Sequence, residues 1–101
     1  MYLIETTIQF DKWLKKLKDK SAIGRILTKL KMVELGNLGD SKSVGGGVSE
    51  LRLTYGPGYR IYFSKKGNTI ILLLHGGNKS NQSSDIKKAK AILKELEINH
   101  D

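Results

Sequence analysis

Two arginines on neighbouring predicted strands are the residues of this sequence best suited to chemistry. The chain contains 15 lysines but only three arginines. Arg52 and Arg60 both fall on the polar face of alternating segments, and Tyr62 follows Arg60 on that face. Opposed positions in a β-hairpin are about 5 Å apart, so the two guanidinium groups can converge. Like charges this close need an anion between them, and a phosphate held by paired hydrogen bonds meets that need.

The same pattern also allows a purely structural role for the two arginines. Glu50 shares the polar face and could neutralise one of them in a salt bridge. Salt-bridged arginines are common on strands, and two basic residues alone do not define a site. The third arginine, Arg25, lies in a predicted helix, where we expect it to be exposed. The pattern by itself leaves both interpretations open.

Lys79 is a third candidate cation, because it follows Gly76-Gly77-Asn78 after an apolar strand. Loops at strand ends often carry functional groups, since the sheet positions them rigidly. The alternative is a solvated loop lysine, one of fifteen. The glycine pair does not make a phosphate-binding loop, because the Gly-x-x-x-x-Gly-Lys-Ser/Thr spacing is absent.

His75 is the one histidine inside a predicted element and could act as a general acid or base. By alternation it shares a strand face with Ile71 and Leu73, so a packed structural histidine is the competing interpretation. His100 lies near the C-terminus, where we expect no role for it. No spacing of histidine and acidic residues indicates a metal site.

These residues must be positioned by short strands and amphipathic helices. Alternation predicts a hairpin of strands at 49–55 and 59–64, joined by Gly56-Pro57-Gly58. An apolar run at 69–75 predicts a central strand that ends at Gly76 and Gly77. Another short strand is expected at 2–6.

Three helices are expected from apolar stripes with helical spacing. The first includes 10–17, the second begins at the N-cap Ser21 and stops at Gly36, and the last carries apolar positions over 86–96. The glycine-rich segment 36–47 is expected to be a mobile loop. The predicted fold is α+β in the order β-α-α-β-β-β-α, with an antiparallel meander and an N-terminal helical hairpin. We expect the helices to cover one face of the sheet and leave the other available.

Length and composition set the broad class of the protein. One domain covering residues 1–101 is expected. A net charge of +8 favours a polyanionic partner such as nucleic acid, a ribosome or an acidic protein, although solubility alone could explain it. The absence of cysteine excludes disulfides and thiolate chemistry and fits a reducing cytoplasm. No apolar run approaches the ~20 residues of a membrane span, and no signal peptide is recognisable, so we expect a cytoplasmic protein.

Three segments of the chain resemble a known family. They are Glu50-Leu51-Arg52, the stretch 55–63 with its Gly-Pro-Gly-Tyr-Arg motif, and 72–80 with Asn78-Lys79-Ser80. Residues near both ends of the chain continue the pattern, so the resemblance covers nearly all of it. The sequence is similar to the addiction-module killer proteins, the phage Gp49-like branch of the RelE/HigB toxins.

The resemblance implies the toxin of a type II toxin–antitoxin pair: a metal-independent endoribonuclease without a cofactor that cleaves mRNA, usually on the ribosome. Its partners would be mRNA, the ribosome and a cognate antitoxin, with no membrane. Arg60 matches the arginine of the family's Tyr-Arg motif, and Arg52 and Lys79 match basic positions; Tyr62 could stack on a base or share a proton. We expect further RNA contacts from four lysines: Lys42, Lys65, Lys66 and Lys79.

The sequence departs from the family pattern at positions that matter for catalysis. Many RelE toxins have two basic residues where this chain has Glu50 and Arg52, and many have a tyrosine or histidine near the last helix, where it has Gln82, Ser84 and Asp85. The general acid and base are therefore open between Glu50, His75 and groups of the ribosome. The alternatives are an RNA- or ribosome-binding protein that does not cleave, and a non-toxic phage-derived interaction protein. From the charge, we expect an antitoxin that is acidic or has an amphipathic helix.

Overall fold

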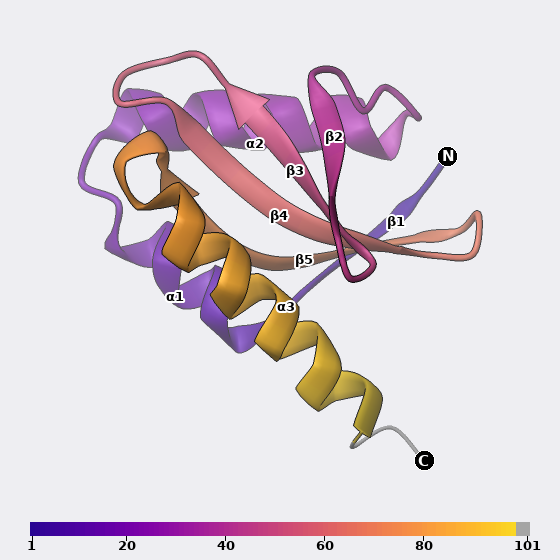
Figure 1. Ribbon diagram of the computed structural model, residues 1–101. Coiled ribbons are helices and arrows are strands. Elements are labelled where there is room, and N and C mark those ends of the chain that lie inside the picture. The colour runs from indigo at the N-terminus through magenta and orange to yellow at the C-terminus, as the bar shows by residue number, and fades with distance from the viewer. Residues whose placement is uncertain (99–101) are drawn as a thin grey trace.

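The computed structural model describes residues 1–98 and shows a mixed sheet flanked by helices (Figure 1). The order of elements confirms the predicted α+β fold, with one strand more than expected. The elements are β1 (Leu3–Thr6), α1 (Ile8–Lys16), α2 (Lys20–Glu34), β2 (Ser41–Gly45), β3 (Val48–Leu53), β4 (Tyr59–Lys66), β5 (Ile70–Asn78), the 3₁₀ turn η1 (Lys79–Asn81) and α3 (Gln82–Ile98).

The five strands have the spatial order β1-β5-β4-β3-β2. The predicted meander of β3, β4 and β5 is antiparallel throughout, and β1 joins the edge of β5 in parallel. The strand expected to be central, β5, lies inside the sheet, but β4 occupies its middle. Gly76 and Gly77 do not end β5, because their backbone still pairs with Ile61 and Arg60.

The segment predicted to be a mobile loop contains the edge strand β2, so that prediction was wrong. Ser41, Lys42 and Ser43 pair with β3 in antiparallel register. The glycines that suggested a loop form the tight turn between β2 and β3, where Gly45, Gly46 and Gly47 all have positive φ. The turn chemistry was visible in the sequence, but the short polar strand beside it had no hydrophobic alternation to reveal it.

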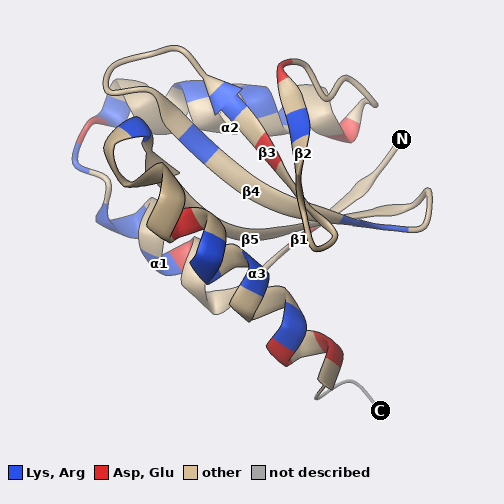
Figure 2. Ribbon diagram, in the orientation of Figure 1, with Lys and Arg blue, Asp and Glu red and all other residues tan. Residues whose placement is uncertain are grey.

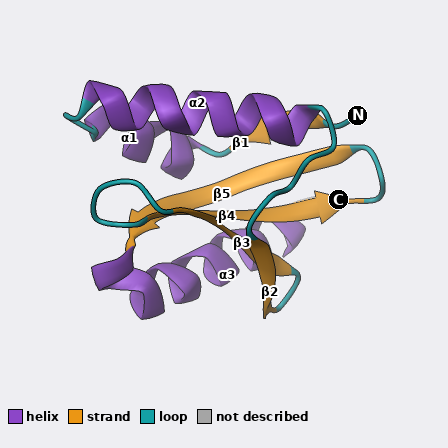
Figure 3. Cartoon of the chain, turned by 90° about the horizontal axis from the view of Figure 1, so that it is seen from above, coloured by secondary structure: helices purple, strands orange, loops and turns teal. Residues whose placement is uncertain are grey.

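Helices cover both faces of the sheet, which corrects the expectation of one open face (Figures 1 and 3). On the first face, α1 and α2 contribute Phe10, Ala22 and Ile26 to a core with inward residues of β3, β4 and β5. On the second face, α3 buries Ala89 and Leu93 in a smaller core. The second core exists because the sheet residues that alternate with the first set are also apolar: Val48, Tyr62, Leu72 and Leu74.

The two N-terminal helices are fixed by side-chain caps. The Thr7 hydroxyl accepts a hydrogen bond from the Phe10 amide at 3.0 Å and donates to the Leu74 carbonyl at 2.7 Å, which ties the start of α1 to β5. The cap of α2 is Asp19, whose carboxylate accepts from the Ala22 amide at 3.2 Å. Ser21, the predicted cap, is therefore inside the helix; both residues are good caps, and the sequence did not distinguish them.

Candidate functional site

The three predicted cations meet at one end of the β3–β4 hairpin. Arg52 and Arg60 lie directly opposite each other in the antiparallel register. Together with Lys79 they line a pocket of about 450 Å³ that also includes the turn Gly56-Pro57-Gly58. Gly58 has a φ of +79°, and a Cβ there would lie 3.4 Å from the Cβ of Lys79, so the turn and the lysine are in close contact.

Arg60 forms a buried ion pair with Glu50, as the structural alternative proposed. Its Nη1 donates to Glu50 Oε1 at 2.8 Å, and the Glu50 side chain is completely buried. The second carboxylate oxygen accepts from Gln82 Nε2, also at 2.8 Å. Glu50 therefore joins β4 to the first turn of α3 and is not free to abstract a proton.

Arg52 has a different partner, which the sequence did not reveal. Its Nη2 donates to Asp40 Oδ1 at 2.9 Å, and this hydrogen bond and charge raise the pKa of Arg52. Asp40 immediately precedes β2, so a strand that was not predicted carries the partner close to Arg52. Both ion pairs leave the arginine Nε atoms buried without an acceptor in the described residues.

The pocket remains positive despite these two ion pairs. Three cations and one carboxylate, that of Asp40, line it, and Lys79 is exposed and forms no ion pair within residues 1–98. An anion with several oxygen atoms is the ligand that suits such a pocket.

The other predicted RNA-contacting lysines are spread along the sheet (Figure 2). Lys42 pairs with Glu50 in register, one strand away from Arg52 and two strands away from Arg60, and is exposed. Lys65 and Lys66 lie at the opposite end of β4 from Arg60. Lys66 is six residues beyond Arg60, a separation of roughly 20 Å along an extended strand. Lys65 stands over the ring of Tyr2, with Nζ 5.3 Å from the centroid. The structure therefore does not bring Lys65 and Lys66 to the arginine pocket.

Tyr62 is buried under α3 and its side chain is not accessible, so stacking on a base does not fit its position. Its hydroxyl forms no hydrogen bond with any of the described residues. Burial raises the pKa of this hydroxyl above its ordinary value of 10.0, and the charges of Glu50 and Asp85 raise it further. Tyr62 is therefore a neutral core residue at physiological pH.

Replacing Tyr62 with phenylalanine should be nearly neutral at pH 7 and stabilising in alkali. At pH 7 the change removes a buried hydroxyl without a partner, so we expect the free energy of unfolding to change by less than about 0.5 kcal/mol. The folded wild type keeps this proton above pH ~10, where the unfolded chain loses it, so wild-type stability falls as the pH rises. Urea unfolding at pH ~7 and ~11 tests this. A wild type and variant that lose stability equally in alkali would contradict it.

His75 lies on the face opposite to the one expected. Its Nε2 is 3.2 Å from Asp85 Oδ1 at the start of α3, so the side chain points toward α3, away from Ile71 and Leu73. The cause is a β-bulge: Tyr62 pairs with His75 and the next residue of β4 pairs with Leu73, which leaves one extra residue in β5. An extra residue reverses the alternation that follows it.

The surroundings of His75 separate it from the arginine pocket. It lines a different cavity, of about 270 Å³, between the start of α1 and α3. Its Nδ1 is buried and has no partner among the described residues. His100 lies outside the described residues. Within residues 1–98 there is no group of three or more histidine, cysteine and acidic side chains that could hold a metal, and no helix is long and apolar enough to cross a membrane.

Comparison with solved structures identifies the fold. The chain is similar to a mutant of the Escherichia coli toxin RelE in the free state, with a TM-score of 0.64 over 86% of this chain and 96% of that one. The two sequences are 16% identical, so the likeness establishes a shared fold. The protein therefore has the RelE fold, as the sequence resemblance predicted.

Comparison of sequences identifies the family. The family model described as phage derived protein Gp49-like matches residues 12–97. An uncharacterized protein of Haemophilus influenzae is 46% identical over 93 residues, which are 92% of this chain and 94% of that protein. The protein belongs to the phage-derived Gp49-like family.

Proposed function

We propose that this protein is the toxin of a toxin–antitoxin pair and acts as a metal-independent endoribonuclease on mRNA, at the ribosome. The observation that carries the proposal is the meeting of Arg52, Arg60 and Lys79 in one positive pocket. The RelE fold and the Gp49-like family support it, since RelE is described as a toxin. The net charge of +8 suits an RNA substrate and an acidic antitoxin.

The proposed reaction is attack of an RNA 2′-hydroxyl on the adjacent phosphate. The 2′-oxygen forms a bond to phosphorus and loses its proton, while the bond to the 5′-oxygen breaks and that oxygen gains a proton. Negative charge builds on the phosphoryl oxygens, and preplaced cations stabilise it more in the transition state than in the ground state. Arg60, fixed by Glu50, and Arg52, fixed by Asp40, are the preplaced cations, and Lys79 is the third.

A second candidate function is RNA binding without cleavage. It is favoured by the positions of Glu50 and His75, the two residues that the sequence suggested as general acid or base. Glu50 has both oxygens engaged inside the protein, and His75 lies in another cavity. The titratable groups that do line the pocket with the arginines are Asp40, Tyr59 and Lys79. For cleavage, these or groups of the ribosome must move the two protons.

Expression of the full chain alone, from a tightly controlled promoter, separates these functions. We expect growth arrest and new 5′ ends inside translated messages for the wild type, and neither for Arg60→Ala. Because that change leaves Glu50 buried without its partner, Lys79→Ala serves as a second variant: Lys79 is exposed and its loss should not unfold the protein. Lys12→Ala, on the exposed side of α1, is the matched control and should behave as wild type.

The outcomes divide the alternatives. Arrest with intact messages supports binding without cleavage. Normal growth with soluble wild-type protein and intact messages contradicts the toxin assignment. Capture of the protein from its native host with no acidic partner would contradict the expected antitoxin.

A further inference from the structure

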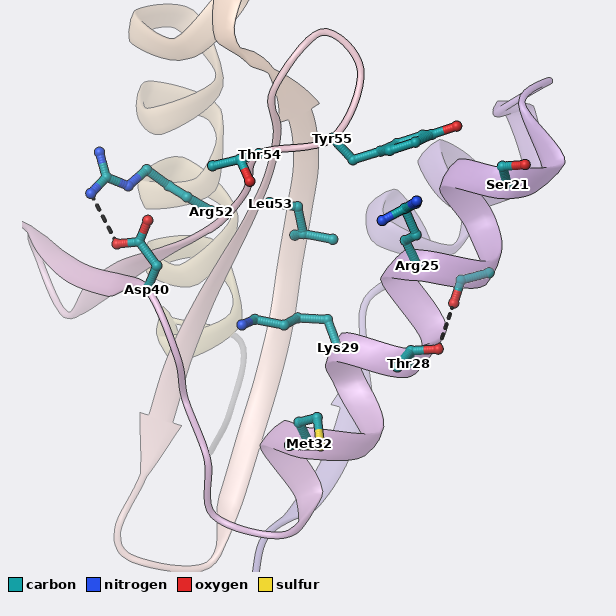
Figure 4. A pocket seen from close by; sticks show the side chains of 11 residues that line it. Ser21, Arg25, Thr28, Lys29, Met32, Asp40, Arg52, Leu53, Thr54 and Tyr55 are labelled. Atoms are coloured by element: carbon teal, nitrogen blue, oxygen red, sulfur yellow. Dashed lines mark hydrogen bonds and ion pairs between the residues drawn. The ribbon is translucent and has the colours of Figure 1, made fainter.

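A second, larger groove adjoins the arginine pocket, between α2 and the end of β3 (Figure 4). Its volume is about 790 Å³. The two hollows share four lining residues: Asp40, Arg52, Leu53 and Thr54. They therefore form one continuous depression, with the Arg52–Asp40 ion pair at the boundary between its two halves.

The groove carries two positive charges, both on α2, that no carboxylate of the described residues neutralises. Arg25 and Lys29 from α2 line it together with Arg52, and Asp40 is the one acidic residue in its lining. Asp40 is already bonded to Arg52. Arg25 and Lys29 form no ion pair with any residue in the described part of the chain. A polyanion that fills the arginine pocket would find two further cations beside it.

Arg25 is held in place by an aromatic ring. Its guanidinium carbon lies 4.2 Å from the centroid of the Tyr55 ring, although the arginine as a whole is exposed. Tyr55 is half-buried, with its ring packed against the larger core. Stacking on an anchored ring orders a guanidinium group without using its N–H donors. Figure 4 shows Arg25 and Tyr55 together at one side of the groove, with Arg52 at the other.

We propose that this groove binds the single-stranded RNA segment next to the phosphate held by Arg52, Arg60 and Lys79, with Arg25 and Lys29 on its sugar–phosphate backbone. A cationic groove with an aromatic side chain is typical of sites for single-stranded nucleic acid. Continuity with the phosphate pocket favours RNA over an acidic peptide. The inference rests on the proposed function, because it extends the same substrate beyond the reacting phosphate.

Binding of non-cleavable RNA to the purified full chain tests the inference. The probes are a 2′-O-methyl uridine dinucleotide and a 2′-O-methyl oligouridylate of about ten nucleotides, measured by competition and by fluorescence anisotropy. We expect Arg25→Gln to weaken binding of the long strand roughly five- to tenfold and to lower its salt slope by about 0.7, the value for one lost phosphate contact. Binding of the dinucleotide, whose single phosphate would occupy the arginine pocket, should not change.

Matched variants separate the groove from general charge and from folding. Lys29→Gln and Lys20→Gln both remove one lysine from α2, but Lys20 does not line the groove, so only the first should weaken binding of the long strand. Tyr55→Phe keeps the ring under Arg25 and should bind as wild type, whereas Tyr55→Leu should resemble Arg25→Gln.

Three results of these binding measurements would contradict the groove inference. If Lys79→Ala weakens binding of both probes and Arg25→Gln of neither, the groove inference fails while the phosphate pocket of the proposed function stands. If the wild type binds neither probe, the groove inference fails, and the growth and 5′-end measurements described above decide the proposed function separately. If Arg25→Gln leaves RNA binding intact but weakens binding of a purified acidic antitoxin, the groove belongs to a protein partner and the RNA inference is overturned.

Discussion

Replacing Glu50 with alanine is expected to destabilise the fold by about 3–5 kcal/mol. The Glu50 side chain is completely buried and accepts hydrogen bonds from both Arg60 and Gln82. Its loss leaves a nearly buried guanidinium group without a counter-charge and removes the polar link to α3. A domain of this size is stable by about 5–15 kcal/mol, so urea unfolding should show a large shift of the midpoint.

A double-mutant cycle distinguishes the ion pair from simple loss of packing. Arg60→Ala alone should also be costly, because it leaves the Glu50 carboxylate buried and unpaired. The double variant Glu50→Ala/Arg60→Ala removes both charges and should cost clearly less than the sum of the single changes. Additive losses of unfolding free energy would show that the two residues are not coupled, and would contradict a stabilising role of Glu50 through its ion pair with Arg60.

Replacing Gly76 with alanine is expected to cost about 2–3 kcal/mol, because the new methyl group would overlap the indole ring of Trp13. Gly76 is buried inside β5, and α1 lies directly over it at this point. Trp13 would have to move, and its contacts with Phe10 and Tyr59 would be disturbed. Thermal unfolding should show a fall in Tm of roughly 10–20 °C.

Gly24 provides the matched control for the same chemical change. It lies in the interior of α2, and an added Cβ would meet nothing within 4 Å. Alanine is a better helix former than glycine, so Gly24→Ala should stabilise the protein by about 0.5–1 kcal/mol. Equal effects of the two substitutions would show that close packing against Trp13 does not decide the cost.

The sheet that carries the site could be predicted because its strands have strong alternation. Residues of β3 and β4 alternate between the two faces as expected, and short turns fixed their antiparallel pairing. The family resemblance agreed with the fold. Two features were not predicted: β2 is polar and flanked by glycines, and α3 packs on a sheet face on which Tyr62 was expected among polar residues.

The site was predicted in part. The opposition of Arg52 and Arg60 follows from turn length and alternation, and Glu50 was identified as a possible counter-charge. Asp40 could not be paired with Arg52 without knowing that β2 exists. The contact of Gln82 with Glu50 was not predicted, because it spans 32 residues of sequence. Arg25 was expected to be exposed, which is correct, but nothing in its spacing pointed to Tyr55.

The bulge in β5 reverses which residues of that strand face each side of the sheet. Before it, odd-numbered residues such as Leu73 face α1 and α2; after it, odd-numbered residues such as Gly77 face α3. An insertion or deletion of one residue here would exchange the neighbours of both glycines, so that neither Trp13 nor Asp85 would find the space it occupies now. Related sequences should therefore tolerate length changes at the β4–β5 turn far better than at Leu74, although both lie in the same hairpin.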